Sequence, residues 1–201
     1  IGIFFLLPLI CFSIKLGIKN TLNLFLIFFL ICLQGFIGWY MVSSGLVDRV
    51  DVSHYRLALH LVLAFIILSL IFWNFLKYIN IKNSFSKMNS KLPIFFLLLI
   101  FIQITVGGFV SGMDAGKIFN SWPLMGTTYF PDDNSIQNLF NFSVFNDPSL
   151  MQFIHRNLAY LILCFYFVIL IKVYKNKLSN FFNVTKIIGL SLLAQIFLGI
   201  L

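Results

Sequence analysis

The sequence predicts an all-α integral membrane protein, a polytopic helical bundle. Of its 201 residues, 60% are hydrophobic and only 10% are charged, and the mean hydropathy is +0.99, values that soluble globular domains do not reach. The apolar residues also form long runs, separated by stretches that hold most of the lysines and aspartates. A run of about 20 apolar residues is long enough for a helix to cross the hydrocarbon core of a bilayer.

Six apolar stretches predict the helices. They are residues 1–14, 21–43, 56–77, 92–112, 151–171 and 187–201. The four inner stretches are each long enough to cross a membrane, whereas the first and the last are too short. Because the chain begins with isoleucine and stops inside an apolar run, we expect it to be a piece of a longer protein that lacks helices at both ends.

The positions of lysine and aspartate predict which connections face the cytoplasm. Residues 77–91 and residues 172–186 each hold four lysines and no acid, so both connections should be cytoplasmic. In residues 44–55 and 113–150 aspartates outnumber the basic residues, so these connections should lie on the outer, periplasmic side. The net charge of +8 is then explained mostly by topology, and no basic surface indicates a nucleic-acid partner.

A glutamine followed four residues later by a glycine occurs in three of the stretches. Residues four apart lie on one face of a helix, the glycine lets a neighbouring helix or a flat ligand come close, and a glutamine in lipid must find a partner. Each copy alone is explained at least as well by helix packing as by a binding site. The pairs are Gln34 and Gly38, Gln103 and Gly107, and Gln195 and Gly199.

Two histidines occupy matching positions in helices that run inward. His60 lies in YRLALHLVLA and His155 in MQFIHRNLAY, each just inside the outer end of its stretch, and Ala64 and Ala159 follow them by one helical turn. A lone histidine in a membrane can be held by a hydrogen bond from a neighbouring helix or can bind a metal. Two histidines at the same depth favour a duplicated binding site.

The surroundings of the two histidines favour a haem as their ligand. A neutral imidazole near the outer surface, flanked by small residues, suits a planar macrocycle with its propionates toward water. Arg56 lies one turn before His60 and Arg156 adjoins His155, so both arginines are candidates for propionate contacts, although arginine at a helix end also extends to the headgroups. Zinc would need further ligands at this depth, and a proton relay would need acids that the apolar stretches lack.

Four sequence blocks resemble the heme A synthase family in order and in spacing. They are LQGFIGWYMVSSGL, VSHYRLALHL, GGFVSGMDAGKIFNSWPLMG and MQFIHRNLAY. The resemblance runs over essentially the whole chain and implies part of an eight-helix protein built from two pseudo-symmetric four-helix bundles. Residues 1–80 would belong to the N-terminal bundle as the end of helix two and helices three and four, residues 81–91 to a cytoplasmic linker, and residues 92–201 to the C-terminal bundle as helices five, six and most of seven.

The resemblance also implies a reaction and a set of ligands. The protein would be a multi-pass oxidoreductase of the cell inner membrane that oxidises the methyl group of heme O to a formyl group, giving heme A for cytochrome c oxidase. His60 would be an axial ligand to the iron of heme O, the substrate, and His155 an axial ligand to heme B, the cofactor. The implied partners are heme O synthase, an electron donor, the lipid bilayer and, in a homo-oligomer, further copies of the chain.

The family relies on a glutamate that this sequence does not contain. All six acidic residues are aspartates, so we expect the catalytic glutamate to lie upstream of residue 1 and residues 1–201 alone to be inactive. Two other functions use the same features: a b-type cytochrome membrane anchor that carries electrons, and a membrane transporter built from repeats. Transporters commonly interrupt helices with glycine or proline, and residues 56–77 and 151–171 contain neither.

Overall fold

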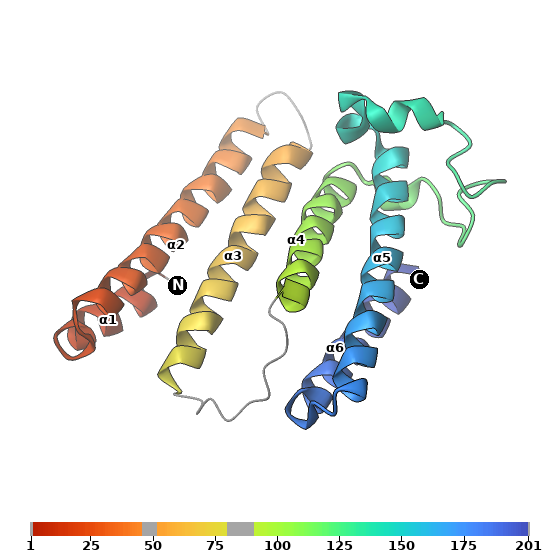
Figure 1. The fold of residues 1–201 in the computed structure, drawn as a ribbon. Coiled ribbons are helices and arrows are strands. Elements are labelled where there is room, and N and C mark those ends of the chain that lie inside the picture. The colour runs from red at the N-terminus through yellow and green to blue at the C-terminus, as the bar shows by residue number, and fades with distance from the viewer. Residues whose placement is uncertain (1, 46–51, 80–90, 201) are drawn as a thin grey trace. The chain divides into compact units, whose positions relative to one another are not determined.

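The computed structural model describes residues 2–45, 52–79 and 91–200 (Figure 1). Over these residues the chain forms helices joined by turns and irregular segments, and an isolated β-bridge pairs Met125 with Thr128. The prediction of an all-α fold is confirmed. The chain divides into two compact units, Ile1–Lys82 and Asn83–Leu201. The assignment of these parts to two four-helix bundles stays a prediction.

The described part of the first unit, residues 2–45 and 52–79, contains three helices. They are α1 (Gly2–Leu16), α2 (Ile18–Gly45) and α3 (His54–Tyr78). α2 packs against both α1 and α3 (Figure 1). Gly17 is the single residue between α1 and α2, and its φ of +76° is a left-handed conformation that glycine adopts without a steric penalty. The carbonyl of Gly17 then accepts a hydrogen bond from the backbone N–H of Thr21 at 3.1 Å, so α2 begins directly after the turn.

The second unit is organised around one long helix. Its elements are α4 (Lys91–Gly112), η1 (Ala115–Lys117), η2 (Ile136–Phe140), η3 (Phe142–Asn146), α5 (Pro148–Lys175) and α6 (Ser179–Ile200). α5 packs against α4, α6, η1 and η3. The start of α5 is specified locally, because Asp147 accepts a hydrogen bond from the backbone N–H of Leu150 at 3.0 Å and Pro148 occupies the first turn.

A tight turn joins α5 to α6. Lys177 has a φ of +50°, and the backbone N–H of Leu178 donates to the carbonyl of Val173 at 3.0 Å, which closes the end of α5. Farther along the two helices, the hydroxyl of Tyr166 donates to the carbonyl of Thr185 at 2.9 Å. The side chains of Val173 and Leu178 are buried where the helices meet.

The structure corrects the prediction for the last stretch. Residues 187–201 were expected to be too short to cross a membrane, but α6 begins at Ser179 and its 22 residues make it a candidate span. The connection predicted over residues 172–186 is correspondingly shorter, since its ends belong to α5 and α6. The reason is that Lys186 and the polar residues before it lie in the first turns of α6, where polar side chains near a membrane surface do not interrupt a helix.

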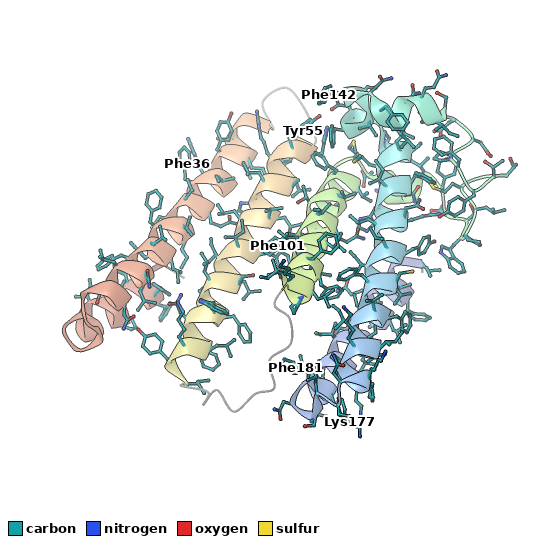
Figure 2. All side chains as sticks on the ribbon, viewed as in Figure 1. Phe36, Tyr55, Phe101, Phe142, Lys177 and Phe181 are labelled. Carbon is teal, nitrogen blue, oxygen red and sulfur yellow. The ribbon has the colours of Figure 1, made fainter. Side chains whose placement is uncertain are left out.

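Among the residues that the structure describes, five helices are long and apolar enough to cross a bilayer. The candidate spans are Asn20–Ser43, His54–Tyr78, Lys91–Gly112, Pro148–Lys175 and Ser179–Ile200. The four inner apolar stretches of the sequence are all among them. Few of their large apolar side chains are fully buried, and Figure 2 shows Phe36, which is 59% exposed, pointing away from α2. A surface of this composition is what a membrane protein presents to lipid.

Candidate functional site

His155 on α5 is held by a glutamine from α4. The side-chain amide nitrogen of Gln103 lies 3.3 Å from Nε2 of the His155 ring and 3.2 Å from the backbone oxygen of the same residue. Both contacts are partly buried. The two residues are 52 positions apart in the sequence, so the pairing depends on the packing of α4 against α5.

His60 in the first unit has the same arrangement. The side-chain amide nitrogen of Gln34 on α2 lies 3.1 Å from Nε2 of His60 on α3 and 3.0 Å from the backbone oxygen of His60. The sequence predicted that these histidines occupy equivalent positions and that each glutamine needs a partner. It did not identify the histidine as that partner, although the matching depths of the glutamines and the histidines indicated it.

The glycines of the two pairs make room for the histidine rings. A Cβ placed on Gly38 would lie 3.0 Å from Cε1 of His60, and a Cβ placed on Gly107 would lie 3.3 Å from Cε1 of His155. Both distances are shorter than nearly all real contacts of a Cβ atom. Any other residue at these positions would therefore push against the imidazole, and glycine is explained by the ring rather than by helix packing alone.

The third glutamine and glycine pair lies on α6 in different surroundings. Gln195 is exposed, and a Cβ placed on Gly199 would meet nothing within 4 Å among the residues that the structure describes. The pattern therefore accompanies a histidine in two of its three copies within the described ranges.

Each pair of a glutamine and a histidine leaves polar atoms that are buried and make no hydrogen bond within the described part of the chain. They are Nδ1 of His60 and His155 and Oε1 of Gln34 and Gln103. A buried polar group without a partner carries a cost of about 1–3 kcal/mol, so these atoms mark places where a ligand or water would be accommodated. An imidazole held beside a glycine could bind the iron of a haem, a common role of histidine in haem proteins.

The two arginines make different contacts. The guanidinium carbon of Arg56 lies 4.8 Å from the centre of the Tyr40 ring, a cation–π arrangement within the first unit. Arg156 donates to backbone carbonyls of the connection between α4 and α5: to Ser121 at 2.8 Å and to Phe119 at 2.7 Å. The sequence did not predict that Arg156 fastens this connection to α5. The propionate contacts expected of both arginines stay a prediction.

Further contacts fasten the same connection to α5. The side-chain amide of Gln152 donates to the carbonyl of Phe119 at 3.0 Å, and the indole N–H of Trp122 donates to the hydroxyl of Tyr160 at 2.8 Å. Gln152 precedes His155 by three residues and is buried, so it lies on the same side of α5 as the candidate ligand. Together with Arg156, these residues hold the connection between α4 and α5 against the end of α5 that carries His155.

A tight turn around Asp132 lies in the middle of the connection between α4 and α5. The carboxylate of Asp132 accepts hydrogen bonds from the backbone N–H of Thr127 at 2.6 Å and from the hydroxyl of Thr128 at 2.9 Å. These bonds stabilise the charged form, the one from the Thr127 backbone most strongly, and lower the pKa of Asp132 below its ordinary value. Gly126 has a φ of +88° and a Cβ there would overlap the carboxylate, so the turn requires glycine.

Comparisons with known proteins cover the whole chain. The sequence profile of a family described as "Cytochrome oxidase assembly protein", COX15-CtaA, matches residues 1–201. The chain is 48% identical over 205 residues to the heme A synthase of Pelagibacter ubique (strain HTCC1062), covering 100% of this chain and 60% of that protein. It is 40% identical over 207 residues to the heme A synthase of Rickettsia bellii (strain RML369-C), covering 100% and 61%.

A third relative gives the same result. The chain is 39% identical over 206 residues to the heme A synthase of Wolbachia pipientis wMel, covering 100% of this chain and 57% of that protein. The chain thus spans about three fifths of the length of the curated relatives it matches. No solved structure matches it.

Proposed function

We propose, from the premise that the chain belongs to the COX15-CtaA family of cytochrome oxidase assembly proteins, that it forms the haem-holding part of a heme A synthase. The proposed reaction oxidises the methyl group of heme O to a formyl group and gives heme A for cytochrome c oxidase. The observation that carries the proposal is the duplicated arrangement in which Gln34 holds His60 and Gln103 holds His155. Two imidazoles held alike favour two haem sites over two unrelated packing contacts.

The two sites have different roles in this proposal. His60 is an axial ligand to the iron of heme O, the substrate, and His155 is an axial ligand to heme B, the redox cofactor. Bound haem supplies the redox chemistry, and the protein supplies binding, orientation and electrostatics. The glycine beside each ring and the buried polar atoms around it support an imidazole kept ready for a planar ligand.

The remaining parts of the proposal concern orientation and partners. Arg56 and Arg156 contact haem propionates, a pairing that guanidinium groups favour. Residues 44–55 and 113–150 lie on the periplasmic side of the cell inner membrane, and the lysine-rich connections lie in the cytoplasm. Figure 2 shows Phe142 and Lys177 at opposite ends of α5, in agreement with connections on opposite sides of a membrane. Heme O synthase, an electron donor and a second copy of the chain are the proposed protein partners.

Haem titration of the two histidines tests the proposal directly. The chain in lipid nanodiscs is titrated with heme O and heme B, and bound haem is followed by its absorption spectrum. His60→Ala should abolish the binding of heme O and retain that of heme B, and His155→Ala should do the reverse. His54→Ala is the matched control, because His54 is the third histidine of the chain and has no proposed role as a ligand. Retention of both haems by both ligand variants would contradict the proposal.

The reaction is tested with the full-length protein. Expressed in cells that make heme O but no heme A, it should cause heme A to accumulate in extracts separated by chromatography. The His60→Ala and His155→Ala variants should not. An electron-carrying cytochrome would bind haem and leave its methyl group unchanged, so this assay separates the two functions.

A further inference from the structure

Each glutamine makes two contacts with one histidine, and together these contacts define the protonation of the ring. The backbone oxygen of His60, 3.0 Å away, can only accept a hydrogen bond, so the atom of Gln34 that faces it is the amide NH2 group. The same NH2 group lies 3.1 Å from Nε2 of the ring. Since an amide NH2 donates and does not accept, Nε2 must carry the lone pair, and in the neutral ring the proton lies on Nδ1.

The second unit repeats this arrangement. The Gln103 nitrogen lies 3.2 Å from the backbone oxygen of His155 and 3.3 Å from its Nε2. In both units the buried Nδ1 atom and the buried amide oxygen make no hydrogen bond within the described residues. The corresponding atoms are therefore placed alike in two units that share no residues, which argues against a chance side-chain rotamer as the cause.

The alanines one turn after the histidines explain how the glutamines reach the backbone. A helical side chain tilts toward the N-terminus, so the side chain four residues after a carbonyl lies close to that carbonyl. Ala64 follows His60 and Ala159 follows His155 by four residues, and both are small. A larger side chain at either position would cover the carbonyl that the glutamine contacts.

We infer that Gln34 and Gln103 are positioning residues that hold the rings of His60 and His155 with Nε2 unprotonated, so that haem iron can take the Nε2 lone pair in place of the amide hydrogen. The inference rests on the proposed function. The backbone contact anchors the amide, the contact with Nε2 selects the ring tautomer, and Gly38 and Gly107 provide the space in which the ring lies. Glutamine, glycine, histidine and alanine thus form one four-residue arrangement that the chain contains twice.

A measurement on the haem-free chain tests the tautomer. The chain, labelled with 15N-histidine and reconstituted in nanodiscs, is studied by NMR, in which protonated and unprotonated ring nitrogens have well-separated shifts. His60 and His155 should both show an unprotonated Nε2 and a protonated Nδ1. Protonation on Nε2 in either ring of the wild-type chain would overturn the inference for that unit.

Two substitutions of Gln103 separate positioning from packing. Gln103→Met keeps the approximate size of the side chain but cannot donate, so His155 should show a mixture of tautomers. Gln103→Glu introduces an acceptor, so the proton should move to Nε2. Gln137→Met is the matched control, because Gln137 is exposed in η2, and it should leave both rings unchanged. If His155 in Gln103→Met kept the wild-type tautomer, the glutamine would not set it.

Haem binding gives the second measurement. Gln103 contacts the nitrogen that would bind iron, so its amide has to leave Nε2 when haem binds, and its effect on affinity comes from the tautomer that it selects beforehand. An equal mixture of tautomers would halve the fraction of rings ready for iron, so we expect Gln103→Met to weaken the binding of heme B by about 2-fold. Gln34→Met should do the same to the binding of heme O. Affinity equal to or higher than that of the wild type would overturn the inference, because the amide would then be neutral or would compete with iron for Nε2.

The alanines provide an independent test of the anchor. Ala159→Leu should cover the carbonyl of His155, release Gln103 and give the mixed tautomers expected of Gln103→Met, while Ala159→Gly, which places no side-chain atom near this carbonyl, should retain the wild-type tautomer. The haem-free NMR measurement distinguishes failure of this inference from failure of the proposed function. A wild-type chain with the expected tautomers that bound no haem would contradict the function, whereas a chain that bound haem with the other tautomer would contradict the positioning role.

Discussion

Gly38 on α2 lies so close to His60 on α3 that a Cβ added to the glycine would be 3.0 Å from Cε1 of the ring. The corresponding distance from Gly107 to His155 is 3.3 Å. The small difference matters because repulsion rises steeply below van der Waals contact. The first unit should therefore tolerate a methyl group less well than the second.

Gly38→Ala should displace the His60 ring and destabilise the first unit by about 1–3 kcal/mol, the usual cost of overfilling a packed site. Thermal unfolding in nanodiscs and titration with heme O measure the two effects. Gly35→Ala on the same helix is the control, since a Cβ there meets nothing within 4 Å, and it should be neutral or slightly stabilising. Equal effects of the two substitutions would mean that the glycine does not make room for the ring.

Arg156→Met should loosen the connection between α4 and α5 while leaving α5 itself intact. Hydrogen bonds to a charged group contribute about 1.5–3 kcal/mol each, and Arg156 donates to the carbonyls of both Phe119 and Ser121. Hydrogen exchange measured by mass spectrometry should become faster over residues 119–124 and remain slow in the middle of α5. Unchanged exchange in residues 119–124 would contradict the anchoring role of the arginine.

The turn at Asp132 should lose its structure at acidic pH. Because its pKa is lowered in the folded protein, the carboxylate contributes stability above its ordinary pKa of 3.8, and this contribution is lost as the pH falls through the lower, folded value. The NMR shift of the Thr127 amide proton should stay constant from neutral pH to about pH 4 and change only below it. Asp132→Asn should remove this acid transition, and a transition that persisted in the variant would have another origin.

Gly189→Ala should separate α5 from α6. A Cβ at this position would overlap the hydroxyl of Tyr166, which donates to Thr185, and we expect a loss of about 1–3 kcal/mol in stability. Thermal unfolding measures the loss. Gly199→Ala on the same helix is the control, because a Cβ there meets nothing within 4 Å among the described residues. Similar stabilities of the two variants would show that the Tyr166 contact can rearrange at little cost.

Hydrophobic runs predicted most of the fold, because lipid requires helices to be apolar along their whole length. The start of α6 was missed for the opposite reason: Ser179 and Lys186 are polar, yet they continue the helix near the membrane surface. The turn around Asp132 was also beyond prediction, since it depends on Thr127 and Thr128 meeting one carboxylate after the chain reverses.

The candidate site was predicted in part. The equal depths of His60 and His155 indicated a duplicated site, and their pairing with Gln34 and Gln103 required the helix packing that the sequence does not state. Arg156 was expected to face a propionate, but its position next to His155 does not reveal the carbonyls that it contacts. Contacts between distant segments depend on the rotation of each helix about its axis, which a pattern of apolar residues fixes only coarsely.

The contact from each glutamine to a backbone oxygen has an evolutionary consequence. Every residue has a backbone oxygen, so this bond survives when the histidine is replaced by another amino acid. A lineage that lost an imidazole would lose the proposed iron ligand and keep the helix pair joined. In each copy, the bond that joins the two helices uses the backbone oxygen, and the proposed iron binding uses the side chain of the same residue. Each copy is therefore free to change its ligand without first losing its fold.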